Sequence, residues 1–579
     1  MKSSDYIVEF LASKGIRHCY GFQGTMIAHL VDSIGRSDKL TNHVCYNEQG
    51  AAYAAVGEAK VSGKPAVAYA TSGPGATNLL SGISDAYFDS APVIFITGQL
   101  NTTEYLPVEG IRQHGFQEMD VISVMKPMVK YCRMIKDPSE IRETFEAAFY
   151  YATEGRPGPV LIDLPMNMQR MEINPDEMKG FDIPCEEKED ESAYENAAEQ
   201  ILAEIKAASR PVLMLGNGVS KHDRESVRSL IEKLGIPVCQ SMLGRDILPY
   251  DHELNFGMLG SAYGHRYTNM IMNTKADLIV ALGDSLCKRQ TGVKFEGFAV
   301  DARIIRVDID PLELERKIKA DGNELGYLLD CNRLIDVMNE RAEKSDRHSD
   351  WVSVCAELRR ELDAFDESCD ERLPNKTVAA ISERTEAFAT IAGDVGQHQL
   401  WTAQSYKVRD GQRMIFSGGY GAMGFSLPAA IGAAISTGKP ALVIAGDGAF
   451  QMNIQELQWV VRERLPITIA VMNNCSLGLI QQQQDDIFEG RYFGALAEGG
   501  YDTPSFAAIG KAYGLNSYRT ESIEDVEKVF DSIDPSQPNL VEVMLPVDVK
   551  AYPKTNFGDP IHRQKPYVPE ELFNRLMEL

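Results

Sequence analysis

The sequence lacks the features that mark several common classes of protein. Its ten cysteines are scattered and include no Cys-x-x-Cys pair. Its longest apolar runs, such as 465–472, are far shorter than the ~20 residues that span a bilayer. No signal peptide is evident before Asp5, so we expect a reducing cytoplasm in which most thiols are small core side chains.

Positive charge is also scarce. The chain has 58 Lys and Arg against 83 Asp and Glu, which gives a formal net charge of −25. Because such a field repels phosphate backbones and anionic headgroups, we expect neither a nucleic-acid nor a membrane partner. Otherwise the composition is that of a globular protein, and 579 residues suffice for about three to five domains at ~100–200 residues each.

Short runs of Val, Ile, Leu and Ala recur along the chain, each followed by a segment with helical spacing of apolar residues. Because these runs are apolar throughout, both faces of the strands should be buried, as in parallel sheets covered by helices. The sequence therefore predicts an α/β fold. The runs are 65–70, 92–97, 159–164, 211–215, 278–282, 304–309, 441–445 and 467–472.

Two acidic, polar stretches, 185–192 and 340–375, interrupt this pattern and are interpreted as linkers or solvated surface helices. They divide the chain into three units, each long enough for one doubly wound parallel sheet. We expect domains over 1–180, 190–345 and 365–579. In such sheets ligands bind beyond the carboxyl ends of the strands, which directs attention to the turns there.

The strongest candidate site lies in the third unit. The run 441–445 leads into Gly446, Asp447 and Gly448, and 25 residues separate Gly448 from Asn474, which follows the next run. Glycines let a phosphate approach the backbone, and a helix start supplies free N–H groups. Aspartate and asparagine offer hard oxygens to a divalent cation. The pattern predicts a site for a magnesium-bound diphosphate.

This pattern resembles the cofactor signature of the thiamine-diphosphate enzyme superfamily, and the likeness to its acetolactate synthase branch extends over nearly the whole chain. The resemblance implies a pyrimidine-binding N-terminal domain, a central domain and a diphosphate-binding C-terminal domain. It also implies that Asp447, the side chain of Asn474 and the main-chain oxygen of Ser476 bind Mg²⁺. Further cofactor contacts are implied for Gly446, Gly448, Ala449 and Gly478.

Two upstream loops match the same family. The stretch 394–399 matches the loop that touches the diphosphate from the other side, which implies contacts from Gly396, Gln397 and His398. In the loop 419–425, Met423 matches the methionine that holds the cofactor bent, and Gly421 belongs to the same cofactor-binding loop.

A lone glutamate, Glu48, enters an alanine-rich helix. Thiamine chemistry requires a carboxyl group beside the aminopyrimidine ring to promote loss of the C2 proton. By resemblance Glu48 is that group, supplied to the cofactor of a neighbouring subunit, so we expect a homodimer or homotetramer. Whether a regulatory small subunit joins it stays open. Gly24, Thr71 and Asn78 are the other cofactor contacts implied in this domain.

The reaction pocket is indicated by two further matches. Phe116 and Gln117 correspond to the aromatic and amide residues that line it in acetolactate synthases. Simple 2-keto acid decarboxylases carry two adjacent histidines in this region, whereas only His114 is present here. Arg289 aligns with the arginine that lies near the carboxylate of a 2-keto acid acceptor.

Three positions depart from the family. Ser285 stands where an arginine usually contacts a non-redox FAD, so FAD binding stays open, although Arg245 or Arg266 could substitute. Met166 replaces a common lysine, and Gln483 replaces a tryptophan that shapes acceptor choice. The acceptor therefore stays open as well.

Together the matches imply a thiamine-diphosphate-dependent carboligase of the acetolactate synthase type. It would decarboxylate pyruvate, a 2-keto acid, and transfer the two-carbon unit to a carbonyl acceptor. One alternative is a decarboxylase that protonates this unit instead. Another is transfer to an aldehyde, to sulfoacetaldehyde or to a nucleotide-linked keto sugar. A third is a non-catalytic binding protein on the same fold, for which Glu48, Asp447 and Asn474 would have no chemical use.

Overall fold

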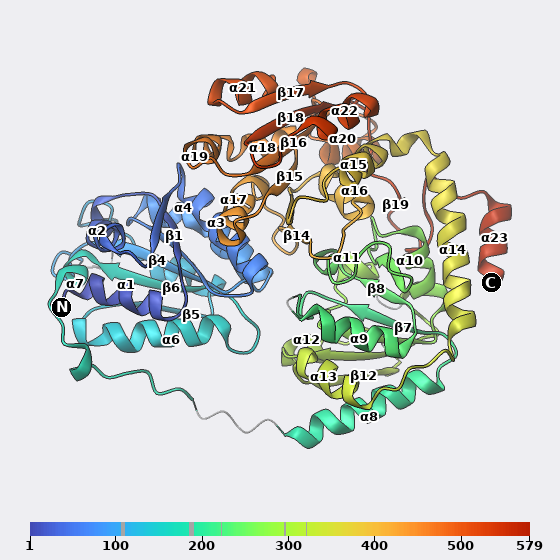
Figure 1. Ribbon diagram of the computed structural model, residues 1–579, viewed down its shortest axis with the longest axis horizontal. Coiled ribbons are helices and arrows are strands. Elements are labelled where there is room, and N and C mark those ends of the chain that lie inside the picture. The colour runs from blue at the N-terminus through green and yellow to red at the C-terminus, as the bar shows by residue number, and fades with distance from the viewer. Residues whose placement is uncertain (106–109, 185–189, 222, 294–296, 320) are drawn as a thin grey trace.

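The computed structural model describes residues 1–105, 110–184, 190–221, 223–293, 297–319 and 321–579, which form three α/β units (Figure 1). Each unit has a six-stranded sheet in which all neighbouring strands are parallel. All eight predicted apolar runs form strands of these sheets, and their residues are almost entirely buried. The predicted fold class is confirmed.

The N-terminal and C-terminal sheets have the same topology. Numbered within each unit, their strands lie in the order 2-1-3-4-6-5, so each order reverses between its first and third strands. The N-terminal strands are β1 (His18–Gly21), β2 (Thr41–Val44), β3 (Ala66–Ala70), β4 (Val93–Gln99), β5 (Tyr131–Met134) and β6 (Val160–Pro165). The C-terminal strands are β13 (Thr390–Gly393), β14 (Arg413–Phe416), β15 (Ala441–Gly446), β16 (Ile467–Asn473), β17 (Asn516–Thr520) and β18 (Asn539–Met544).

The middle sheet differs. Its strand order within the unit is 3-2-1-4-5-6, the order typical of dinucleotide-binding folds, with a switch point between its first and fourth strands. The strands are β7 (Pro211–Leu215), β8 (Val238–Gln240), β9 (Asn255–Met258), β10 (Leu278–Leu282), β11 (Arg303–Asp308) and β12 (Glu324–Leu328).

The N- and C-terminal units pack through equivalent helices, α3 (Glu48–Ser62) and α17 (Ser426–Thr437), each of which follows the second strand of its sheet (Figure 1). Glycines let the two backbones approach closely. A Cβ on Gly57 would lie 2.1 Å from the Ala429 carbonyl oxygen, and one on Gly432 would lie 1.8 Å from that of Ala54. This contact therefore depends on small side chains.

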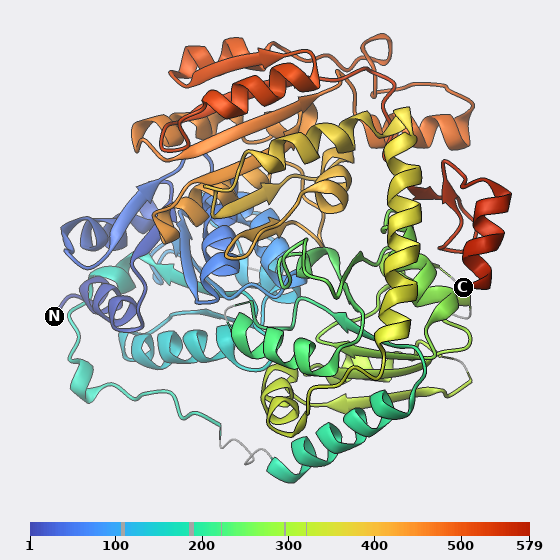
Figure 2. The same cartoon turned by 45° about the vertical axis from the view of Figure 1, so that its right-hand side comes forward.

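The stretch 340–375 is helical rather than a loose linker. Its main element, α14 (Ser349–Ser368), buries Trp351, Cys355, Leu358 and Leu362 at helical spacing and runs from the middle unit to the C-terminal unit (Figure 2). Residues 185–189 of the first predicted linker, with Cys185, lie outside the described residues. The chain finishes at α23 (Glu570–Glu578), which packs against the middle unit, where Lys275 donates a hydrogen bond to the Met577 carbonyl oxygen at 2.7 Å.

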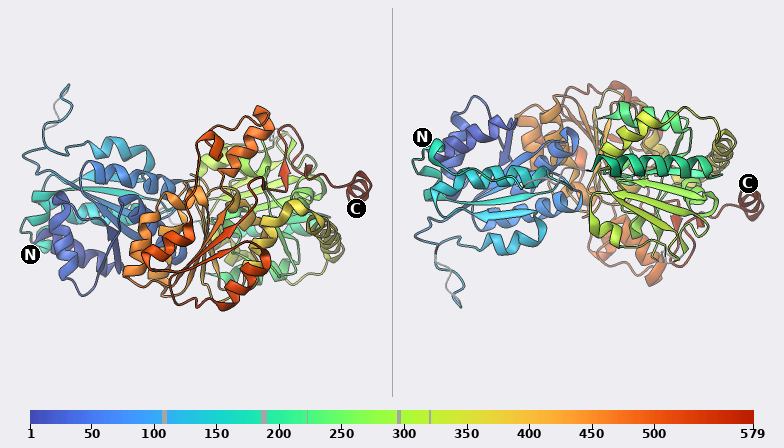
Figure 3. Two further views of the ribbon diagram at one scale, coloured as in Figure 1. Left: turned by 90° about the horizontal axis from the view of Figure 1, so that it is seen from above. Right: turned by 90° about the horizontal axis from the view of Figure 1, so that it is seen from below.

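The remaining helices cover the faces of the three sheets, and the two chain ends lie at opposite sides of the molecule (Figure 3). No helix among the described residues is both long and apolar enough to cross a membrane. These helices are α1 (Ser3–Ser13), α2 (Ala28–Arg36), α4 (Pro74–Phe88), α5 (Val121–Met125), α6 (Ile141–Thr153), α7 (Met166–Arg170), α8 (Glu191–Ala207), α9 (Arg224–Leu234), α10 (Arg266–Met270), α11 (Lys288–Thr291), α12 (Pro311–Glu315), α13 (Cys331–Arg341), α15 (Leu373–Glu383), α16 (Gln397–Ser405), α18 (Asp447–Gln451), α19 (Leu457–Arg462), α20 (Gly478–Phe488), α21 (Phe506–Tyr513) and α22 (Ile523–Ser532).

Candidate active site

Three helices begin at the carboxyl edge of the C-terminal sheet, where its strand order reverses. They are α16 after β13, α18 after β15 and α20 after β16. Their first turns lie against one another: a Cβ on Gly446 would lie 2.5 Å from the His398 ring, and one on Gly478 would lie 1.9 Å from Gln397 Oε1. The free N–H groups of three helix starts therefore face one region, which suits an anion.

The side chains of Asp447 and Asn474 lie in this region. Asp447 is only 3% exposed, and its two carboxylate oxygens accept backbone hydrogen bonds from Gly448 at 2.7 Å and Ser476 at 3.0 Å. Burial raises its pKa to about 6. The Asn474 amide donates to Gln397 Oε1 at 3.5 Å. No group of three or more His, Cys, Asp or Glu side chains suited to a metal occurs among the described residues, so a cation here would also need backbone or ligand oxygens.

One buried polar atom of this cluster, the His398 Nε2, has no hydrogen-bond partner. Burial lowers the pKa of His398 to about 3, so its ring is neutral. The hydroxyl of Tyr501, a residue that the sequence patterns did not single out, lies beside the Asp447 carboxylate. Because an unpaired buried polar group is costly, the His398 Nε2 indicates a polar ligand, and a diphosphate with its cation fits the donors present.

Hydrogen bonds to the Asp394 carboxylate hold the loop that carries Met423 in place. This buried carboxylate accepts hydrogen bonds from the backbone of Gly424 and from both the backbone and hydroxyl of Ser426, at 2.6–2.9 Å. The Met423 methyl group lies 3.5 Å from the Cβ position of Gly448, so it reaches the helix start of α18. Gly421 of this loop faces open space.

A second cluster surrounds Glu48 at the equivalent switch point of the N-terminal sheet. Glu48 is buried, and its Oε2 accepts a hydrogen bond from the Asn78 amide at 2.9 Å. A Cβ on Gly75 would lie 2.9 Å from Thr71 and 3.1 Å from Glu48 Oε1. A Cβ on Gly24 would lie 2.4 Å from Thr71. The structure thus brings together Glu48 and the three residues predicted to contact the cofactor in this domain, Gly24, Thr71 and Asn78.

The residues predicted for the reaction pocket are divided between the units. Gln117 has a positive φ of 62°, and its backbone packs against Gly73 beside the Glu48 cluster. Phe116 is 78% exposed. Arg289 belongs to the middle unit. Its side chain donates a hydrogen bond at 2.8 Å to the carbonyl oxygen of Gly418, which directly precedes the loop that carries Met423.

Within one chain, the two clusters stay separate. Among the described residues, Glu48 contacts side chains of its own unit, and no hydrogen bond joins it to Asp447. Several hydrogen bonds bridge the two units next to Glu48. The Gln49 side chain accepts one from Asn453 at 3.2 Å, and the Glu456 carboxylate accepts others from the backbone of Tyr46 and Asn47 at 3.0–3.1 Å.

The switch point of the middle sheet is largely filled by its own loops. A Cβ on Gly216 would lie 2.1 Å from the Gly283 carbonyl oxygen, and one on Gly218 would lie 2.8 Å from Gly283 Cα. The buried carboxylate of Asp284 accepts two hydrogen bonds from Gln290 at 2.9 and 3.0 Å. Gly216 and Gly218 therefore allow these loops to pack closely. The Asp284 carboxylate lies at the switch point, which is where a dinucleotide-binding fold holds the diphosphate of its ligand.

Neither arginine considered as a replacement at Ser285 forms a hydrogen bond or ion pair with that residue's loop among the described residues. The Nε of Arg245 donates to the Ala403 carbonyl oxygen at 3.0 Å. Arg266 pairs with Asp366 at 2.7 Å. These residues do not fit a flavin diphosphate well.

Family models match all three units. The model described as "Thiamine pyrophosphate enzyme, N-terminal TPP binding domain" matches residues 1–124. The central-domain model of that family matches 198–336, and its C-terminal TPP binding domain matches 394–543. The chain belongs to the thiamine pyrophosphate enzyme family. Thiamine pyrophosphate is thiamine diphosphate under another name, so the resemblance found in the motifs is confirmed.

Individual relatives cover nearly the whole chain. It is 35% identical to acetolactate synthase isozyme 1 large subunit of Escherichia coli over 553 residues, which is 95% of each chain. It is 34% identical to a probable acetolactate synthase large subunit of Methanocaldococcus jannaschii, covering 100% of this chain and 98% of that protein. The acetolactate synthase large subunit of Lactococcus lactis is 32% identical over 94% of this chain and 92% of its own.

Proposed function

We propose that this protein is a thiamine-diphosphate-dependent carboligase of the acetolactate synthase type, which decarboxylates pyruvate and transfers the two-carbon unit to a carbonyl acceptor. The observation that supports it most is the pair of clusters at equivalent switch points. One carries a buried glutamate, and the other carries Asp447, Asn474 and three helix starts. Acetolactate synthase relatives along the full chain agree with this assignment.

The residues have distinct roles at the diphosphate end. Asp447 and the Asn474 side chain, with the main-chain oxygen of Ser476, would hold Mg²⁺. Gln397 and the unpaired His398 Nε2, which lie against the glycine turns, would contact the phosphate oxygens. The glycine turn and Gly478 allow the close approach of the phosphates.

At the other end, bound thiamine diphosphate supplies the nucleophilic carbon and the electron sink for decarboxylation. Glu48 would hold a proton beside the aminopyrimidine nitrogen, and Asn78 keeps that carboxyl group in place. Met423, on the loop anchored by Asp394, would support the bent cofactor. Phe116 and Gln117 would exclude water from the reacting carbon, and Arg289 would face the acceptor carboxylate.

The proposal includes assembly into at least a dimer. Glu48 has no contact with the Asp447 cluster among the described residues of its own chain, so a second copy would bring the two together. Exposed apolar side chains occur near both clusters, among them Phe116 and Ile480. A homodimer or a homotetramer meets this requirement.

Product identification separates this function from its alternatives. Purified protein with thiamine diphosphate and Mg²⁺ is incubated with ¹³C-labelled pyruvate, alone and with a panel of keto acids, aldehydes and nucleotide-linked keto sugars, and the products are identified by mass spectrometry. A labelled C–C product supports the carboligase. Acetaldehyde as the only product would indicate the decarboxylase instead, and unchanged pyruvate with bound cofactor would indicate a binding protein.

A further inference from the structure

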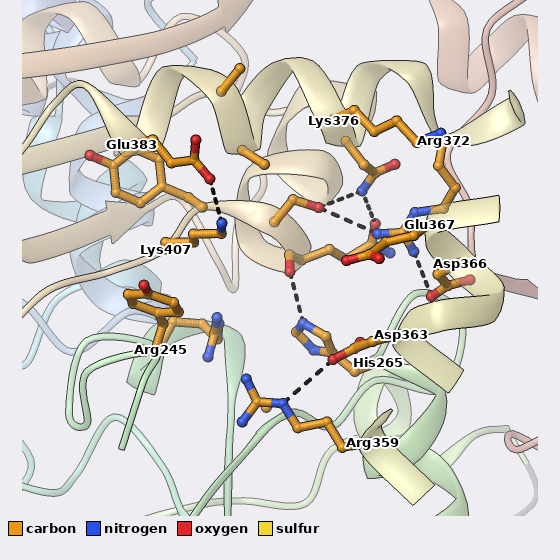
Figure 4. Close-up of a pocket in the computed structure, with 18 of the residues that line it drawn as sticks. Arg245, His265, Arg359, Asp363, Asp366, Glu367, Arg372, Lys376, Glu383 and Lys407 are labelled. Carbon is orange, nitrogen blue, oxygen red and sulfur yellow. Dashed lines mark hydrogen bonds and ion pairs between the residues drawn. The ribbon is translucent and has the colours of Figure 1, made fainter. Parts of the chain in front are cut away.

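A pocket of about 420 Å³ lies between the middle and C-terminal units (Figure 4). Its volume is in the range of small-molecule sites. The walls come from the loops around β9, from α14 and α15, and from the carboxyl end of α16. The labelled side chains in Figure 4 are almost all charged.

Arg245 is the unusual residue of this pocket because it is 5% exposed and forms no ion pair with any described carboxylate. Its Nε donates to the Ala403 carbonyl oxygen at 3.0 Å, and its Nη1 donates to Gln240 Oε1 at 3.1 Å. These neutral partners satisfy two donors but leave the charge uncompensated. A buried charge without a counter-ion is costly.

A second guanidinium group, that of Arg359 on α14, points into the same space (Figure 4). It donates to the Asn255 carbonyl oxygen at 3.1 Å, and its one carboxylate neighbour, Asp363, lies 3.5 Å away. His265 also lines this pocket. Burial and the charges of Arg245, Arg372 and Arg359 lower its pKa to about 3, so this neutral ring adds no charge.

Most other carboxylates of the pocket are already engaged by cations. Glu367 is exposed at the rim, so it does not compensate the buried arginine. The engaged pairs are Asp366 with Arg266 and Arg372 at 2.7 and 2.8 Å, Glu383 with Lys407 at 2.6 Å, and Glu527 with Arg384 at 3.1 Å. The carboxylates that line the pocket therefore leave the guanidinium group of Arg245 without a paired negative charge.

We propose that this pocket binds a small hydroxylated organic anion, whose carboxylate or phosphate group lies between the guanidinium groups of Arg245 and Arg359. The planar guanidinium fork matches two oxygens of either group. Asn375, 2% exposed, has a buried amide oxygen without a partner, which would accept a hydrogen bond from a ligand hydroxyl. Tyr250 and Tyr267 provide less polar walls.

Helix α16 connects this pocket to the proposed cofactor site. Gln397 and His398 stand at its start, whereas Gln404 and Ser405 line the pocket at its end, and Arg245 binds the carbonyl of Ala403 in the same last turn. An anion that moves Arg245 would therefore displace this helix. We expect the ligand to change the affinity for thiamine diphosphate, an effect that rests on the proposed function.

Binding is tested with inorganic phosphate by titration calorimetry on the holoenzyme, in which thiamine diphosphate and Mg²⁺ occupy the cofactor site. Arg245→Gln and Arg359→Gln should each weaken phosphate binding by about tenfold or more, the loss expected for one charge-assisted contact. Arg360→Gln is the matched control, because Arg360 is exposed on the same helix and pairs with Glu361. Equal binding by the wild type and both pocket variants, or no binding by the wild type, would overturn the site.

Arg359→Gln keeps the test valid if the buried Arg245→Gln variant fails to fold. The coupling is measured separately, as the affinity for thiamine diphosphate with and without saturating phosphate. We expect a change of about fivefold in the wild type and none in Arg359→Gln. A change that persists in Arg359→Gln would mean competition at the cofactor site, and no change at all would refute the coupling. Failure of every protein to bind thiamine diphosphate would count against the proposed function instead.

Discussion

Two buried carboxylates, in different surroundings, carry the proposed chemistry. Glu48 accepts a side-chain hydrogen bond from Asn78 on Oε2, which orients the carboxyl group. Asp447 is held on both oxygens by backbone N–H groups, which fixes its position as a metal ligand requires. In the proposed function, the same functional group would serve proton transfer in one domain and cation binding in the other.

Replacing Glu48 with Gln should abolish the proton-transfer role while leaving folding intact, because the amide has the same shape but cannot supply the carboxyl proton. We expect C2 deprotonation of bound thiamine diphosphate to slow by about 100-fold or more, within the range of general acid–base contributions. Deuterium exchange at C2, followed by NMR, measures it. Glu58→Gln is the control, since Glu58 lies on the same helix but binds the Tyr20 hydroxyl at 2.6 Å. If the Glu48→Gln variant exchanged the C2 proton as fast as the wild type, the proton-transfer role of Glu48 would be wrong.

Asp447→Ala should weaken binding of thiamine diphosphate with Mg²⁺ by about 100-fold, because a charged ligand is lost and the diphosphate is left uncompensated. Fluorescence titration of the cofactor at fixed Mg²⁺ gives the affinity. Asp485→Ala is a suitable comparison, because Asp485 lies on nearby α20 but binds Tyr492 and Lys550. Unchanged affinity in Asp447→Ala would show that the metal lies elsewhere.

The sequence indicated Asp447 and Asn474 because each follows an apolar run, and it indicated Glu48 through the family resemblance; their roles stay predictions. It did not reveal Tyr501, whose hydroxyl reaches the helix start of α18 from a loop 53 residues beyond Gly448. Only tertiary packing brings that hydroxyl there, so no local spacing could indicate it. The unpaired charge of Arg245 likewise appears only once its neighbours are known.

At the scale of elements, the N- and C-terminal units place their clusters at the carboxyl edge of equivalent sheets, both with the order 2-1-3-4-6-5. Gly24 and Thr71 follow β1 and β3, and Gln397 and Asp447 follow β13 and β15, which are the strands on either side of each reversal. Glu48 instead follows the edge strand β2, and Asn474 follows β16. The helices α3 and α17, which hold the units together, are also equivalent in the two topologies. The geometry of one cluster relative to the other therefore depends on how closely these helices pack.

Gly432→Ala tests this packing. The added Cβ would lie 1.8 Å from the Ala54 carbonyl oxygen, which is backbone and cannot rotate away, so the helices must separate. We expect a loss of about 1–3 kcal/mol in the free energy of unfolding, as for other overpacked sites. Gly35→Ala is the matched control, because its Cβ meets nothing within 4 Å. Denaturant titration of the wild type and both variants measures these free energies. Equal stabilities of Gly432→Ala and Gly35→Ala would contradict the close packing of α3 and α17.

The strands predicted from apolar runs are buried and central, whereas most of the missed strands are short or lie at an edge; the buried, six-residue β18 is an exception. β17, for example, reads Asn-Ser-Tyr-Arg-Thr and lies half exposed at the edge of its sheet. An edge strand needs no apolar residues on its open side, so its sequence resembles a loop. Composition therefore predicted the fold class and the central strands but not the full sheet order.

At the scale of the whole molecule, the middle unit has a dinucleotide-binding strand order but an acidic and filled switch point. We expect flavin to be dispensable, because Asp284 is buried there and Ser285 offers no positive charge. Loss of one charge-assisted hydrogen bond weakens binding by about 10- to 100-fold. The visible spectrum of protein purified without added flavin, followed by an assay after exhaustive dialysis, measures this. Stoichiometric flavin whose removal abolishes activity would contradict it.

The central claim is that Glu48 of one chain and Asp447 of another act on one cofactor, and mixing two inactive variants tests it most directly. Glu48→Gln and Asp447→Ala are each assayed for C–C product from pyruvate, then unfolded together in equal amounts and refolded. If the two residues act across chains, each mixed dimer has one intact site of its two. Because about half of the reassembled dimers are mixed, about a quarter of the wild-type activity should return. If both residues act within one chain, no mixed dimer has an intact site, and the absence of any recovered activity in a properly reassembled mixture would contradict the account.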